Sequence, residues 1–98
     1  MNDAEDKCVL NVRIPRSLAC RKKELVRGFG YGCHQIVVGE KPSIVPADKT
    51  VAARITLEGR DVVMWEKALA RMPGANNSQM VTTVLALVDE LRAGNARI

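Results

Sequence analysis

Hydrophobic and polar residues alternate strictly over residues 53–58. A period of two is typical of a half-buried strand, because successive side chains of a strand point to opposite faces. One face of this strand is therefore expected to pack on the protein and the other to face outward. The outward positions are Arg54, Thr56 and Glu58.

A helical pattern follows this strand. Apolar side chains recur at helical spacing from Val62 to Met72, which predicts a helix at about 60–72 with the only tryptophan in its buried stripe. Pro73 and Gly74 then end it, because proline cannot continue the hydrogen-bond ladder and glycine tolerates the conformation common after a helix.

A second helix is predicted to begin at Asn76, which forms a capping-box pattern with Gln79 three residues later. Its apolar stripe, from Met80 to Leu91, is wider than one neighbouring helix would cover. We therefore expect a second copy of the chain to cover part of it.

An earlier stretch, residues 9–14, alternates in the same way and ends at Pro15, which suits the first turn of a following helix at 16–27. Three glycines within residues 28–32 predict a loop. The β-branched run at 34–38 favours a strand, and the stretch 40–49, with two prolines, favours a linker. These features indicate an incomplete copy of the later pattern rather than an intact tandem repeat.

The strand-helix-helix order of residues 51–95 resembles the ribbon-helix-helix family of repressors, plasmid-partition regulators, antitoxins and conjugation accessory proteins, and 8–28 resembles a degenerate second half-motif. The resemblance implies a mainly α protein with short β-strands, built as an intertwined homodimer. Strands of two chains would form a ribbon that enters the DNA major groove. We accordingly expect a ribbon-helix-helix domain at 47–98, preceded by a basic N-terminal β/α extension at 1–46.

The resemblance also implies which residues touch DNA. Asn77 and Ser78, in the first turn of the second helix, would present backbone N–H groups to a phosphate. Glu58 departs from the basic or amide residue common in the family, and would accept from a cytosine amino group or lie off the bases. The expected base contacts are Arg54, Thr56 and Glu58 on one strand and Asn11 and Arg13 on the other.

Charge adds a second expectation. The chain of 98 residues has a net charge of +4 and a pI near 9.3, which weakly favours an anionic partner. Between residues 13 and 27 the only acid is Glu24, so this segment would supply the electrostatic grip on phosphates, unless it is simply a solvated helix face. The expected phosphate contacts there are Arg16, Arg21, Lys22, Lys23 and Arg27.

Length and composition limit the domain number, the kind of binding surface and the cellular location. The length suits a single domain, and an aromatic content of 3% argues against a base-stacking surface. The acidic start resembles no secretory signal, and no apolar run approaches a membrane span, so we expect a cytoplasmic protein with reduced thiols.

The candidate chemistry is sparse. Cys8, Cys20 and Cys33 lack metal-ligand spacing, so free thiols are favoured over zinc and no cofactor is expected. Cys33 beside His34 offers a nucleophile and a base, but neighbours in a strand point apart, so an enzyme ranks last. Whether Phe29 and Tyr31 pack inward or touch a partner stays open.

The sequence therefore favours a sequence-specific protein that binds double-stranded DNA as a homodimer, a repressor or a plasmid or conjugation accessory factor. The alternative is a protein-interaction module, such as an antitoxin or a phage inhibitor, whose N-terminal extension binds another protein.

Overall fold

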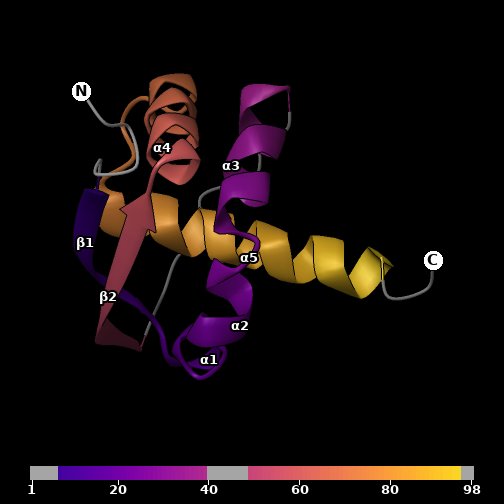
Figure 1. The fold of residues 1–98 in the computed structure, drawn as a ribbon. Helices are drawn as coiled ribbons and strands as arrows, with labels where there is room; N and C mark the ends of the chain where they lie inside the picture. Colours follow the sequence, from indigo (N-terminus) through magenta and orange to yellow (C-terminus); the bar gives the residue numbers. More distant parts are fainter. Residues whose placement is uncertain (1–6, 40–48, 96–98) are drawn as a thin grey trace.

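Seven elements make up the chain in a computed structural model that describes residues 7–39 and 49–95 (Figure 1). Strand β1 leads into three short helices, and strand β2 leads into two longer ones. The elements are β1 (Lys7–Pro15), α1 (Arg16–Ala19), α2 (Lys22–Val26), α3 (Phe29–Val37), β2 (Thr50–Glu58), α4 (Arg60–Arg71) and α5 (Asn77–Asn95). The protein is thus mainly helical with one small sheet, as expected.

The two strands pair with each other, antiparallel, in a two-stranded sheet. The ladder runs from Lys7 opposite Glu58 to Pro15 opposite Thr50, and its central pair is Asn11 and Arg54. The predicted alternation is confirmed in both strands: Leu10, Val12, Ile14, Ile55 and Leu57 are buried.

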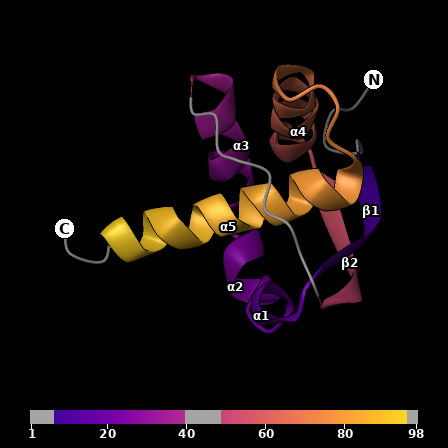
Figure 2. The same ribbon diagram turned by 180° about the vertical axis from the view of Figure 1, so that it is seen from behind.

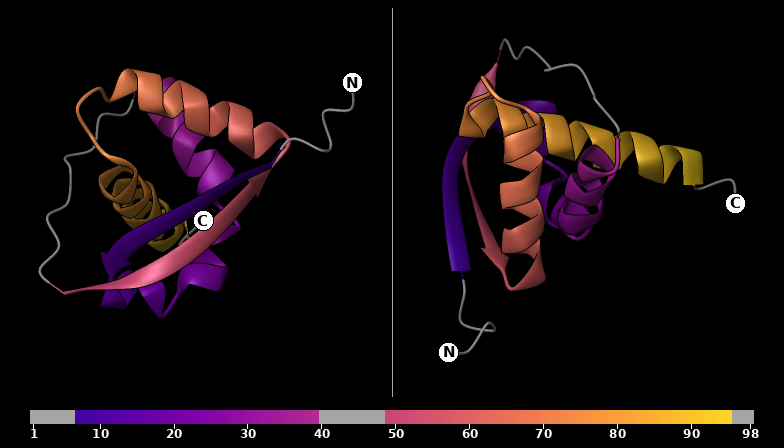
Figure 3. Two further views of the ribbon diagram at one scale, coloured as in Figure 1. Left: turned by 90° about the vertical axis from the view of Figure 1, so that its left-hand side faces the viewer. Right: turned by 90° about the horizontal axis from the view of Figure 1, so that it is seen from above.

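Helices cover one face of this sheet and leave the other face open to solvent (Figure 3, left). Helix α5 crosses behind the sheet and extends past it, as the view from behind shows (Figure 2). Helices α3 and α4 stand side by side and pack on each other, and α5 also packs on β1 and α3.

The predicted boundaries of the last two helices hold. Helix α4 starts directly after Gly59, whose φ of 58° is accessible to glycine. The capping box at the start of α5 is confirmed in both directions: the Gln79 backbone N–H donates to Asn76 Oδ1 at 2.8 Å, and the Asn76 N–H donates to Gln79 Oε1 at 2.9 Å.

The predicted loop at 28–32 and strand at 34–38 are wrong, because residues 29–37 form helix α3. Gly28 and Gly32 lie one turn apart and face α5; a Cβ on Gly32 would come within 2.8 Å of Val88 Cγ2. The glycines therefore permit close helix packing, and the packing overrides their low helix propensity. The predicted helix at 16–27 is likewise divided into α1 and α2.

One core joins the two halves of the chain. Phe29 of α3 lies against Trp65 of α4, with ring centroids 5.6 Å apart. The apolar side chains of α5 that suggested a second copy are covered within the chain: Met80, Val81, Val84, Leu85 and Val88 are all buried. In the dimer that the resemblance implies, the ribbon strands come from two chains, whereas here both belong to one.

Two sequence expectations concern the rest of the chain. The linker predicted at 40–49 lies, except for Lys49, outside the described residues. Within the ranges that the structure describes, every helix is too short or too polar to cross a membrane.

Candidate nucleic-acid interface

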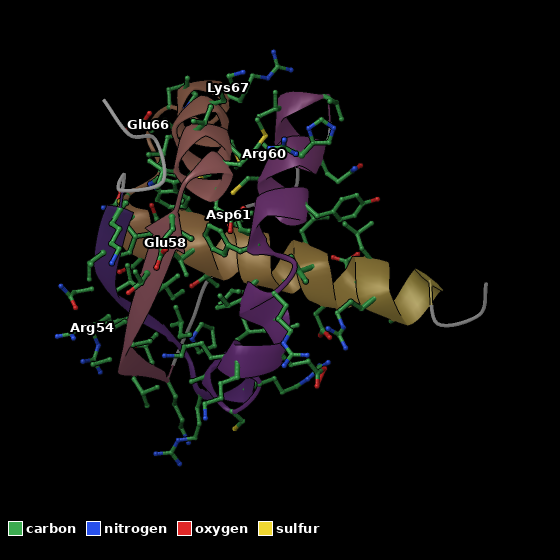
Figure 4. All side chains as sticks on the ribbon, viewed as in Figure 1. Arg54, Glu58, Arg60, Asp61, Glu66 and Lys67 are labelled. Carbon is green, nitrogen blue, oxygen red and sulfur yellow. The ribbon has the colours of Figure 1, made fainter. Side chains whose placement is uncertain are left out.

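The outward face of the sheet gathers the polar side chains that the alternation predicted. Asn11 and Arg13 of β1 and Arg54, Thr56 and Glu58 of β2 are all exposed on it. Arg54 extends away from the sheet (Figure 4). The five residues expected to contact bases therefore share one surface, although the strands that carry them are distant in the sequence.

Arg13 is held in place by the neighbouring strand. Its Nε donates to Thr50 Oγ1 at 3.0 Å, and its Nη2 donates to the Thr50 carbonyl oxygen at 2.8 Å. A guanidinium carries five N–H donors, so three remain for an external acceptor. Thr50 thus orients Arg13 and still leaves N–H donors that can bind another group.

An open hollow of about 420 Å³ lies between Arg13 and Arg54. Ala52, which lies directly opposite Arg13, and Ser78 of α5 also line it. Two exposed arginines therefore border one open depression on this face.

The free edge of β1 is closed by the start of α5. The Arg13 backbone N–H donates to Ser78 Oγ at 3.1 Å, which places the first turn of this 19-residue helix beside the sheet. The unpaired N–H groups and the positive dipole end of a helix start attract anions. Asn77 and Ser78, the expected phosphate contacts, thus lie at the border of the outward face.

The free edge of β2 is closed in a different way. Lys22 Nζ donates to the carbonyl oxygen of Arg54 at 2.9 Å. An ammonium group has three donors, so two remain for a phosphate on that side. Both borders of the sheet therefore carry groups of a kind that can bind anions, a helix start at one and a lysine at the other.

Positive charge concentrates at one end of the sheet. Arg16 and Lys49 meet there, with the Arg16 N–H donating to the Lys49 carbonyl at 3.2 Å, and both residues are exposed. At the other end Lys7 lies opposite Glu58. Lys7, Val9 and Lys49 were not predicted as contacts. The period of two in β1 continues back to Lys7, two residues before the predicted start of that strand, whereas Lys49 directly precedes β2, which starts before the predicted residue 53.

The basic run at 13–27 does not act as one surface. Arg21 forms ion pairs with Asp89 and with Glu24, and the second of these contacts is 3.0 Å long. Arg92 of α5 reaches the same Glu24 carboxylate at 3.2 Å. These pairs join α2 to α5, and the hydrogen bond from Arg21 lowers the pKa of Glu24. Arg21 therefore has a structural role, and Lys22 is better placed for phosphate than Arg21.

Arg27 and Lys23 lie apart from this ion-paired cluster. Both are exposed, and Arg27 lines a hollow of about 550 Å³ between α3 and α4, with Tyr31, His34 and Arg60 around it. Of the aromatic pair, Phe29 packs inward and is fully buried, whereas Tyr31 is exposed.

The surroundings of Cys33 do not favour nucleophilic or metal-binding chemistry. Burial, and to a smaller extent the Asp61 carboxylate, raise the pKa of the Cys33 thiol to about 12, which disfavours the reactive thiolate. His34 is exposed while Cys33 is buried, so the two do not face a common site. In the described part of the chain, no three His, Cys, Asp or Glu side chains are grouped to hold a metal.

Comparison of the chain with models of protein families, with curated proteins and with solved structures gives no match.

Proposed function

We propose that this protein binds double-stranded DNA sequence-specifically by placing the outward face of its two-stranded sheet in the major groove. The groove is about 12 Å wide and admits a two-stranded β-ribbon. The observation that carries the proposal is the exposure of Arg13 and Arg54 on an uncovered sheet face whose two borders both end in phosphate-binding groups.

The face is suited to contacting base edges. Arginine donates in a bidentate manner to guanine, asparagine pairs in the same way with adenine, and a threonine or valine methyl packs on the thymine methyl group. Arg13, Arg54, Asn11, Thr56 and Val9 supply each of these chemistries. Glu58 can accept from a cytosine amino group, which is one of the two roles expected for it from the sequence.

The borders of the face are suited to the phosphates. In a ribbon laid along the groove, the two sugar-phosphate backbones pass outside the two free edges of the sheet. Ser78 and the first turn of α5 stand at one edge and Lys22 stands at the other. Such contacts fix the position of the protein on the duplex, while the face between them contacts bases. A repressor or an accessory factor in plasmid maintenance or conjugation would work in this way.

The test is a selection of bound sequences from random duplex DNA, followed by affinity measurements on the selected duplex. Arg54→Ala and Arg13→Ala should each weaken binding by about 1–3 kcal/mol, the value of a good bidentate base contact. Lys67→Ala is the matched control, because Lys67 is exposed on α4 and points away from the outward face (Figure 4). It should change the affinity less than twofold, or by roughly 0.4 kcal/mol, because a distant exposed charge is largely screened.

Folding must be measured on the same variants. Exposed substitutions alter the free energy of unfolding by about 0.5 kcal/mol or less, so all three variants should keep the melting temperature nearly unchanged. Raising salt should weaken binding steeply, because phosphate contacts release counterions. Equal affinities of all variants for the selected duplex, or an affinity that is flat with salt, would contradict the proposal and favour the alternative of a protein-interaction module.

A further inference from the structure

We propose that one chain alone is the DNA-binding unit, and that its site in duplex DNA is non-palindromic and bound in one fixed orientation. The inference rests on the proposed function of the outward face and adds the form of the DNA site to it. Three features of the sheet carry it.

The first feature is that one chain completes the ribbon. Strands β1 and β2 have nine residues each and pair along their whole length. The inner face of the sheet and the apolar face of α5 are buried without a second copy. Both strands of the outward face, over the residues that the structure describes, come from the same chain.

The second feature is the chemical inequality of the two strands. A two-fold axis through the central pair would exchange Asn11 with Arg54, and each further outward residue with a counterpart on the other strand. Symmetric proteins bind symmetric sites because identical side chains meet identical bases in the two half-sites. Here every exchanged pair differs: Asn11 with Arg54, Arg13 with Thr56, Val9 with Ala52, Lys7 with Thr50 and Pro15 with Glu58. A palindrome would therefore offer half of these side chains the wrong base.

The third feature is the polarity of charge along the ribbon. The end at Arg13 also carries Arg16 and Lys49, all exposed, and the facing residues of the other strand are Thr50 and Ala52. The opposite end pairs Lys7 with the acid Glu58. Phosphate attraction is therefore stronger at one end, and the borders differ as well, since α5 closes one and Lys22 the other. If the chain bound its site in the reverse orientation, the ends and borders of the face would meet different phosphates. The two orientations are therefore not equivalent.

The test uses the full-length chain. Sequences selected from random duplex DNA are aligned, and native mass spectrometry of the complex counts the chains bound. We expect one motif without internal symmetry, occupied by a single 10.7 kDa chain. The selection is then repeated with Arg13→Ala and Arg54→Ala, with Lys67→Ala as the control.

Each arginine variant should lose base preference at a single position of the motif, by about tenfold to a hundredfold, and the two positions should differ. Lys67→Ala should return the original motif. In a two-chain complex on a palindrome, each substitution would instead relax two symmetry-related positions.

The possible outcomes distinguish this inference from the proposed DNA-binding function on which it rests. A palindromic motif occupied by two chains, with paired losses of preference, would overturn the inference and leave the DNA-binding function standing. Failure of the chain to bind any duplex in preference to a scrambled competitor would overturn both.

Discussion

The two halves of the chain follow the same order of elements, a strand and then helices, but they close their cores differently. The second half uses two long helices, α4 and α5, with amphipathic patterns that are visible in the sequence. The first half has three short helices; Gly28 directly precedes the last of these, α3, and Gly30 and Gly32 lie within it. Because these glycines have no side chain, α3 can lie close to both α5 and α4.

This comparison shows that the first half contributes structure as well as charge. Strand β1 is the only pairing partner of β2 in the described residues, and α3 covers Val84 and Val88 of α5. Neither half buries its own strand and helices without the other. The predictions that follow test how far each half depends on its counterpart, from the largest expected effect to the smallest.

A fragment of residues 47–98 should not fold as a monomer. The fragment keeps β2 and α5 but loses β1, which pairs with β2 and packs on α5, and α3, which packs on α4 and α5. The free energy lost with this buried apolar surface should exceed the roughly 5–15 kcal/mol by which small domains are stable. Circular dichroism with heating, together with sedimentation, checks it. A monomeric fragment with the cooperative transition of the full chain would show that the second half is independent.

Alkylation tests whether the core of the first half is closed. With a pKa of about 12 against an ordinary 9.0, Cys33 has about a thousandfold less thiolate than a free cysteine at mildly alkaline pH, and its burial adds to the protection. Cys20 is exposed and should react rapidly. Mass spectrometry of the peptides, with and without denaturant, distinguishes the two. Equal rates in the folded protein would mean that α3 opens readily.

A pair of glycine substitutions tests the close packing of α3. In Gly32→Ala the new Cβ would meet Val88 Cγ2 at 2.8 Å and Val84 Cγ1 at 3.1 Å, and valine side chains in a helix have little freedom to turn away. Overpacking of this kind costs about 1–3 kcal/mol in the free energy of unfolding.

The matched control is Gly94→Ala, near the end of α5, where a Cβ meets no other atom within 4 Å. There the greater helix propensity of alanine should stabilise the protein by up to about 1 kcal/mol. Denaturant unfolding of both variants gives the sign of each change. A stabilising Gly32→Ala would refute the packing role of this glycine.

The ion pairs between α2 and α5 should contribute least, because all of their members are exposed. The pKa of Glu24 is lowered in the folded protein by its hydrogen bond with Arg21 and by the charge of Arg92. The stabilisation is therefore present above the ordinary pKa of 4.5 and is lost as the pH falls through the lowered value.

Glu24→Gln should accordingly reduce stability slightly at neutral pH and make no difference in strong acid. Glu90→Gln, which removes an exposed acid of α5 that joins no ion pair among the described residues, is the control. Urea unfolding of both variants over a pH series checks the prediction. A difference between Glu24→Gln and the wild type that grows as the pH falls would contradict the assignment.

Much of the candidate site could be predicted from the sequence because a strand has the simplest periodicity. The alternation around Asn11 and Arg54 assigned these side chains to outward faces before any fold was known, and the capping box at Asn76 located the start of α5. Helix α4 was equally visible, since its apolar residues face one side.

Tertiary structure decided the rest. The pattern of residues 28–38 could not show that its glycines face α5, because a close approach is a property of two segments and not of one. The same holds for the arginines: Arg13 and Arg21 belong to one basic run, yet one lies on the outward face and the other pairs with Asp89 of a distant helix. The sequence by itself determined which side chains are outward or inward, because that depends on local periodicity. Which strand lies opposite which, and that both belong to one chain, was decided only by the shared burial of a core drawn from both halves.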